Sequence, residues 1–244
     1  MGGEGEIGEI VYAVTTWLLP VLFAITLHEA AHGYVAWKLG DDTAYRLGRV
    51  SFNPLRHIDR FGTIILPGLL LLMRAPFLFG WAKPVPVNPN NFRRPGFADF
   101  MVSFAGPASN FTIALILFFT AKLLAAIHPE LLYTKQEILI NFQLYILPRS
   151  TLLADVFIYV ITINCALACF NLIPLYPLDG HHMLREILPS HLRHRFMGWQ
   201  FQYGGYCLIA LIAGPYFLNT PSPIGRGIFW LFQTLQNYKF GLIA

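Results

Sequence analysis

Residues 25–33 contain the side chains most able to carry out chemistry. His28 and His32 are four positions apart, so both project from one face of a helix and can reach a single Zn²⁺ ion. Glu29 follows the first histidine, where a carboxylate can accept a proton from water bound to the metal. No charged residue occurs at positions 10–27. The pattern predicts a zinc site at the end of a helix that is apolar enough to enter a bilayer.

A catalytic zinc site has three protein ligands and one position open to solvent, so a third ligand must come from elsewhere. Asp179 ends an apolar run whose prolines, Pro174 and Pro177, prevent a regular helix and would keep the backbone open near the metal. An Asp-Gly pair is also a common turn at a helix end. His181 and His182 lie nearby and are of a ligand type that zinc commonly uses. The residues alone leave open which of them completes the site.

The composition indicates a single membrane domain, residues 1–244, with a core at about 10–190 and C-terminal helices at about 199–240. The chain is 55% hydrophobic and 12% charged, against about 25% charged in soluble domains. The net charge of +4 comes from basic residues that flank apolar runs, which is typical of membrane loops rather than of nucleic-acid binding. The first residues carry no positive charge, so we expect no cleaved signal peptide.

The apolar runs predict an all-α polytopic protein with a core of three transmembrane helices. The clear spans are residues 10–37, 100–121 and 156–178. Residues 199–218 are expected to form a fourth span, and residues 224–238 a short fifth span or an interfacial helix. We therefore expect one or two further helices after the core.

Three other segments are expected not to cross the membrane. Residues 61–82 are apolar but interrupted by Pro67 and Gly68, which favours a re-entrant or interfacial piece. Residues 81–88 alternate and are rich in proline, which favours an extended segment. Residues 128–150 are expected to be a polar connector.

The membrane topology follows from the predicted site. If Asp179 meets the two histidines, the C-terminal ends of the first and third spans must lie at one face. Only residues 100–121 can then cross between them. This arrangement places the two most basic loops, residues 38–99 and 180–195, on the side of the active site. The positive-inside rule makes that side cytoplasmic.

Five motifs together resemble the site-2 protease family of intramembrane zinc metalloproteases. They are HEAAH at 28–32, GPASN at 106–110, NLIPLYPLDG at 171–180, FNPLRHID at 52–59 and GWAKPVPVN at 80–88. The last two resemble the short bacterial and archaeal branch, which has no inserted PDZ domain. The resemblance covers roughly residues 10–190.

The resemblance implies one zinc ion per chain, held by His28, His32 and Asp179, with Glu29 as the general base. It also implies that Asn110 helps to hold the substrate backbone or the oxyanion, and that Asn171 lines the site. Spacing alone would equally assign the two asparagines to hydrogen bonds between helices.

The predicted function is hydrolysis of peptide bonds in or near the transmembrane segments of membrane-protein substrates. Two alternatives remain open from the residues. A metal transporter would also place His and Asp inside the membrane, but it would need several sites along a path. A non-catalytic scaffold would hold zinc with four protein ligands, and His181 could be the fourth.

Overall fold

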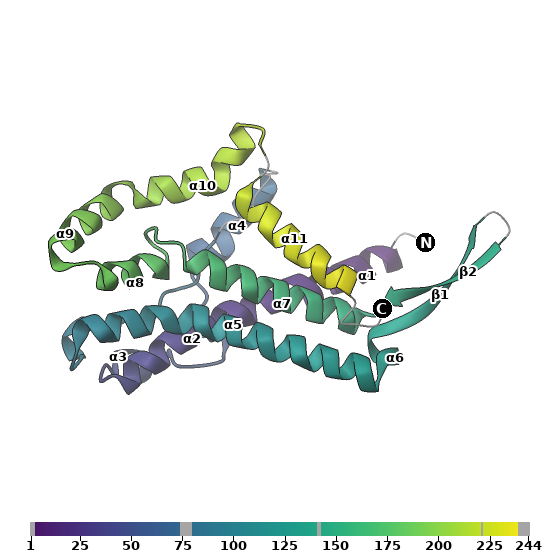
Figure 1. The fold of residues 1–244 in the computed structure, drawn as a ribbon, viewed down its shortest axis with the longest axis horizontal. Helices are drawn as coiled ribbons and strands as arrows, with labels where there is room; N and C mark the ends of the chain where they lie inside the picture. Colours follow the sequence, from purple (N-terminus) through teal and green to yellow (C-terminus); the bar gives the residue numbers. More distant parts are fainter. Residues whose placement is uncertain (1–2, 74–79, 141–142, 221, 239–244) are drawn as a thin grey trace.

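Three long apolar helices form the core of the molecule, as the sequence predicted (Figure 1). The computed structural model describes residues 3–73, 80–140, 143–220 and 222–238. Within these residues, three helices are long and apolar enough to cross a membrane: Ile7–Lys38, Pro95–Ile127 and Leu152–Asn171. The chain is therefore an integral membrane protein with a helical core.

The first span is assembled from consecutive helical pieces. The helix α1 (Gly3–Ala13) runs into a π-turn, η1 (Val14–Leu18), and then into α2 (Leu19–Lys38). The π-turn ends just before the first turn of α2, which contains Pro20. Because proline cannot donate the backbone hydrogen bond of a regular helix, a change of helical winding at this point is expected.

The second and third spans, α5 (Pro95–Ile127) and α7 (Leu152–Asn171), pack against α2 and against each other. Small side chains line the contact between α5 and α7 and let the two backbones approach closely. The C-terminal helix α11 (Pro223–Tyr238) covers the same cluster. Its buried members are Ala114, Ala121, Ala125, Leu132, Ala154, Ile158, Ile161 and Leu235.

The expected polar connector between the second and third spans is instead a short helix and a β-hairpin. The helix α6 (Pro129–Leu132) leads into β1 (Tyr133–Ile140), which pairs antiparallel with β2 (Gln143–Ser150). The register runs from Tyr133 opposite Ser150 to Ile140 opposite Gln143. The hairpin projects beyond the helical core near the N-terminus in Figure 1. The two strand sequences, YTKQEILI and QLYILPRS, show no alternation of polar and apolar residues, so the hairpin was not predicted.

The segment between α2 and α5 does not form a further spanning helix among its described residues. Its elements are α3 (Thr43–Arg46), η2 (Pro54–Arg56), η3 (Arg60–Ile65), α4 (Leu66–Leu72) and η4 (Pro89–Asn91). The joined helix η3–α4 is too short to cross a bilayer, in agreement with the expected re-entrant or interfacial piece. Residues 74–79 of that expected piece lie outside the described residues.

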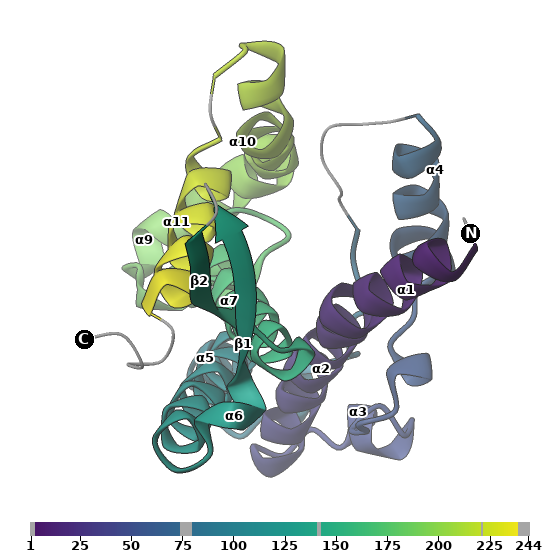
Figure 2. The same cartoon turned by 90° about the vertical axis from the view of Figure 1, so that its right-hand side faces the viewer.

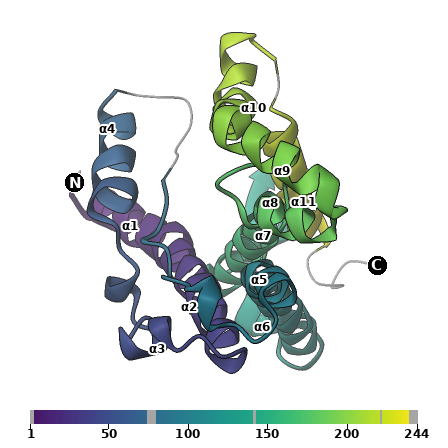
Figure 3. The same cartoon turned by 90° about the vertical axis from the view of Figure 1, so that its left-hand side faces the viewer.

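Four helical elements connect the third span to α11. They are α8 (Asp179–Ile187), α9 (Ser190–Trp199), η5 (Gln200–Gly204) and α10 (Gly205–Phe217). Residues 199–218, which we expected to form a fourth span, are not among the three spanning helices found in the described part of the chain. Figures 2 and 3 show α4 and α10 on the same side of the core, α4 beside α1 and α10 beside α11.

The C-terminal ends of α2 and α7 lie at the same end of the molecule as the N-terminal end of α5 (Figure 1). A buried carboxylate at this end joins two loops. Asp41, which is 0% exposed, accepts hydrogen bonds from the N–H and hydroxyl groups of Thr43, from the N–H of Asn88 and from the amide of Asn91. Burial raises the pKa of Asp41, but these hydrogen bonds outweigh it and hold the pKa below its usual range.

We expect Asp41→Asn to lower the free energy of unfolding by about 2 kcal/mol, because buried N–H groups lose their acceptor. The pKa of Asp41 is depressed in the folded state. Its contribution is therefore present above the unfolded-state pKa of about 3.9 and is lost as the pH falls below it. Thermal unfolding in detergent, followed by tryptophan fluorescence at neutral and acidic pH, measures both effects. Asp42→Asn is the control, since Asp42 forms an exposed ion pair with Arg46. Equal unfolding midpoints for the two variants would contradict this assignment.

Candidate metal centre

His28 and His32 face one side of α2, one helical turn apart. Their side chains are nearly buried, and the ring centroids are 4.6 Å apart with an interplanar angle of 84°. His28 precedes the end of the helix at Lys38 by about 15 Å of helical rise. The pair therefore lies within the first membrane span and not at its edge.

The carboxylate of Asp179 faces both rings from the first turn of α8. Its Oδ2 atom lies 3.1 Å from Nε2 of His28, and its Oδ1 atom lies 3.4 Å from Nε2 of His32. Gly180 lets this turn approach the preceding loop, since a Cβ atom there would lie 2.5 Å from the carbonyl oxygen of Ile173. The structure thus brings together the two histidines and the aspartate that the sequence proposed as ligands, with ligand atoms all within 4.8 Å of one another.

The other ring nitrogens identify the tautomer of each histidine. Nδ1 of His28 lies 2.7 Å from Oδ1 of Asn110, and Nδ1 of His32 lies 2.6 Å from the carbonyl oxygen of Val102. A carbonyl oxygen only accepts, so each Nδ1 carries the hydrogen and each neutral ring presents a lone pair at Nε2. A hydrogen bond to the outer ring nitrogen is the usual arrangement for metal-binding histidines.

The three residues therefore present converging lone pairs that repel one another unless a cation lies between them. Oδ2 of Asp179 is buried and has no hydrogen-bond donor. Two imidazole nitrogens and one carboxylate oxygen fit the three protein ligands of a catalytic zinc site.

Gly106 of α5 lies directly against the two rings. A Cβ atom at this position would lie 2.6 Å from Nε2 of His28 and would also collide with Nε2 of His32. Only glycine therefore leaves the space between α5 and the ligand atoms. Gly106 belongs to the motif at 106–110, and the sequence alone did not connect it with the metal ligands.

Asn110 and Asn164 form a chain of buried hydrogen bonds that ends at Nδ1 of His28. The side chain of Asn110 is 0% exposed, and its Nδ2 donates to Oδ1 of Asn164 at 2.8 Å and to the carbonyl oxygen of Ala24 at 3.2 Å. These two bonds fix the amide so that its oxygen faces His28. The role in holding substrate or oxyanion that the resemblance implied for Asn110 stays a prediction. Asn164 was not predicted from the sequence. The signal that could have identified it is a polar residue within an apolar span.

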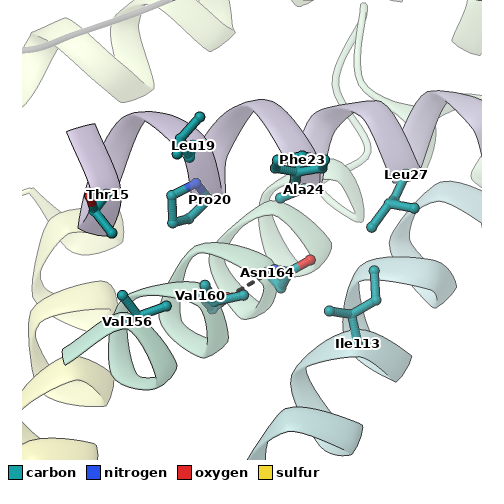
Figure 4. A pocket seen from close by; sticks show the side chains of 10 residues that line it. All are labelled: Thr15, Leu19, Pro20, Phe23, Ala24, Leu27, Ile113, Val156, Val160 and Asn164. Atoms are coloured by element: carbon teal, nitrogen blue, oxygen red, sulfur yellow. Dashed lines mark hydrogen bonds between the residues drawn. The ribbon is translucent and has the colours of Figure 1, made fainter. Parts of the chain in front are cut away.

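An apolar cavity of about 230 Å³ lies between the first span, α5 and α7, and Asn164 is one of its lining residues (Figure 4). Asn164 reaches it from α7, opposite Ala24 of α2. Its lining residues are Thr15, Leu19, Pro20, Phe23, Ala24, Leu27, Ile113, Val156, Val160 and Asn164. None of the three ligand candidates lines this cavity, so it is separate from the metal-binding group.

Glu29 lies beside the metal group and contacts the extended segment that the sequence predicted. Its Oε2 atom accepts a hydrogen bond of 3.0 Å from the N–H group of Val85. The guanidinium of Arg49 holds the same segment by donating to the carbonyl oxygens of Lys83 and Pro84, at 2.5 and 3.4 Å. Residues 80–88 have no helix or ladder hydrogen bonds, in agreement with the expected extended piece.

The two histidines after Asp179 make other contacts. Nδ1 of His181 lies 2.6 Å from the carbonyl oxygen of Leu178, and His182 faces Asp99 of α5 at 3.2 Å. Among the described residues, the metal-binding group contains neither of them. Asn171 donates to the carbonyl oxygen of its own helix at Leu167, and its predicted place in the site stays a prediction.

Ion pairs attach the far end of α8 to α5. Arg185 donates to Asp99 at 2.7 Å and to Glu186 at 2.7 Å, and Arg193 of α9 lies 3.1 Å from Glu186. Asp179 occupies the first turn of α8 and Arg185 the last turn. The network therefore helps to fix the helix that carries the carboxylate ligand candidate.

Comparisons with known proteins agree with this chemistry. The family model for peptidase family M50 matches residues 16–212. The chain is 36% identical over 213 residues to "Putative zinc metalloprotease YwhC" of Bacillus subtilis, covering 87% of this chain and 83% of that protein. It is 27% identical over 111 residues to "Putative zinc metalloprotease Rip2" of Mycolicibacterium smegmatis, covering 46% of this chain and 40% of that protein.

Among solved structures, the site-2 protease from Methanocaldococcus jannaschii matches with a TM-score of 0.45 and 16% identity, over 92% of this chain and 77% of that chain. The family assignment rests on the family model and on the relative from Bacillus subtilis, both of which cover most of the chain. The chain therefore belongs to peptidase family M50, the family of the site-2 proteases that its motifs resemble.

Proposed function

We propose that the protein is a zinc-dependent intramembrane endopeptidase that cleaves peptide bonds in or near the transmembrane segments of membrane proteins. The observation that carries this proposal is the convergence of Asp179 on His28 and His32, which lie within a membrane span beside the carboxylate of Glu29. Membership of a peptidase family supports hydrolysis of a peptide bond as the reaction. Among the described residues there is one such metal-binding group rather than a series along a path, which argues against a transporter.

His28, His32 and Asp179 would hold the zinc ion. When bound, zinc lowers the pKa of water towards 7 and polarises the scissile carbonyl group. Glu29 accepts the proton of the attacking water and later passes it to the leaving nitrogen. The backbone N–H of Val85 fixes the direction of the Glu29 carboxylate while it does so. A substrate helix must unwind first, because its carbonyl groups are otherwise held in helical hydrogen bonds.

We also propose that the metal centre lies nearer the cytoplasmic side of the membrane. Asp179 begins α8, which lies with α9 and the loop after α2 at one end of the molecule (Figure 1). The basic residues of these segments support a cytoplasmic location under the positive-inside rule.

A substitution at Glu29 is expected to separate zinc binding from cleavage. We expect Glu29→Gln to retain about one zinc ion per chain and to lose activity by roughly 10²- to 10⁴-fold, because the amide cannot accept the proton. His28→Ala should lose both zinc and activity. Metal analysis of purified protein and cleavage of a model transmembrane substrate in detergent or liposomes measure the two properties. Cleavage by Glu29→Gln at the wild-type rate would refute its role as the base.

Gly106→Ala should weaken zinc binding by at least roughly tenfold, because the new methyl group displaces both imidazole rings from their hydrogen-bonded positions. Gly214→Ala in α10 is the control, since a Cβ atom there meets nothing within 4 Å. Zinc retention against a competing chelator provides the measurement. The same affinity in both variants would show that α5 does not constrain the ligands in this way.

Val85→Pro should reduce turnover by roughly 10- to 100-fold with zinc affinity unchanged, because it removes the N–H group that orients Glu29. The flanking residues Pro84 and Pro86 already restrict this backbone, so a third proline alters it little. Val85→Ala keeps the N–H group and should cleave nearly as the wild type does. Equal rates for the proline and alanine variants would contradict this role for the N–H group.

A further inference from the structure

Gln200 is a fully buried polar side chain that contacts the loop leading to Asp179. It lies in the π-turn η5 and is 0% exposed. Its Oε1 atom accepts a hydrogen bond of 2.8 Å from the N–H group of Tyr176, and its Nε2 atom donates at 2.7 Å to the carbonyl oxygen of Pro174. One amide side chain thus satisfies two main-chain groups of a segment more than twenty residues earlier.

These two main-chain groups have no helical partner because of the local sequence. Residues 172–178 connect α7 to α8 and contain Pro174 and Pro177, which prevent a regular helix. Pro174 and Tyr176 are exposed residues, but the Gln200 amide that contacts them is fully buried, and buried polar side chains are nearly always hydrogen-bonded. Among the described hydrogen bonds, the carbonyl of Pro174 and the N–H of Tyr176 are paired with Gln200.

Gly204 allows η5 to lie close to the loop at residues 172–178. A Cβ atom at Gly204 would lie 2.7 Å from Oε1 of Gln200 and 3.1 Å from Cβ of Tyr176. The ring of Tyr176 also packs against Phe201, with centroids 5.4 Å apart. A π-turn, a buried amide and a glycine therefore occur together where the C-terminal helices contact the loop, and such turns are frequent at functional sites.

We infer that Gln200 is a positioning residue for the metal ligand Asp179. By holding the main chain at Pro174 and Tyr176, it fixes where α8 begins and thus where the carboxylate faces His28 and His32. The C-terminal helices α9 and α10 thereby act on the metal centre through a side chain that does not touch the metal ligands. The inference rests on the metal site of the proposed function, but it does not require that the reaction be proteolysis.

The test compares matched substitutions on one turn in the full-length protein. Gln200→Met keeps the length of the side chain and removes both hydrogen bonds, so we expect about tenfold weaker zinc binding and a lower kcat with little change in KM. Gln200→Glu keeps an acceptor for Tyr176 and should fall between this variant and the wild type. Gln202→Met is the control, because Gln202 is exposed on the same turn. Chelator competition measures affinity, and the absorption spectrum of the Co²⁺-substituted protein reports the ligand geometry.

A second pair of variants tests the same contact with every hydrogen-bonding group retained. Gly204→Ala should push the loop away and shift the zinc affinity and the Co²⁺ spectrum in the same direction as Gln200→Met. Gly205→Ala should leave both unchanged, since a Cβ atom there meets nothing within 4 Å. If Gln200→Met does not fold, Gly204→Ala decides the matter.

Wild-type zinc affinity and Co²⁺ spectra in Gly204→Ala and in the folded Gln200 variants would overturn the inference. The proposed function alone would be overturned if zinc affinity depended on Gln200 and Gly204 as expected while the zinc-loaded wild type cleaved no membrane substrate.

Discussion

The candidate metal centre depends on two imidazole nitrogens and one carboxylate whose lone pairs converge on one point in surroundings of low polarity. The Nε2 atoms of His28 and His32 face Asp179 because their Nδ1 hydrogens are bound behind the rings by Asn110 and Val102. Without those acceptors either ring could turn or change tautomer, and the ligand set would be lost. The hydrogen bonds at Nδ1 therefore determine the direction in which each Nε2 lone pair points.

This requirement explains why the second span approaches the first so closely. The carbonyl of Val102 and the amide of Asn110 reach the rings only if the α5 backbone lies almost in contact with them, and Gly106 provides that space. On the opposite side, Gly33 of α2 admits the side chain of Val85, whose Cγ1 atom would lie 3.2 Å from an added Cβ. Small residues on both helices thus serve the centre as well as the packing of helices in a membrane.

Irregular backbone surrounds the site, and polar side chains from other segments pair with it. Arg49 and Asp41 hold the two ends of the extended segment, and Glu29 accepts from its middle. Gln200 provides the equivalent contacts for the loop before Asp179. Irregular segments at membrane depth are tolerated where the protein itself satisfies their backbone groups. The irregular segments beside the candidate site are consequently fixed in geometry.

The sequence by itself determined the helical spacing of His28 and His32, the placement of Asp179 after a span, and the number of spans that brings their ends to one side. These follow from helical periodicity, hydropathy and chain length, which are local properties. The tertiary structure alone decided that the carbonyl of Val102 supports His32, that Asn164 orients Asn110, and that Gln200 holds the loop. The physical reason is that any residue has a carbonyl group, and only packing of distant segments selects which polar group meets it.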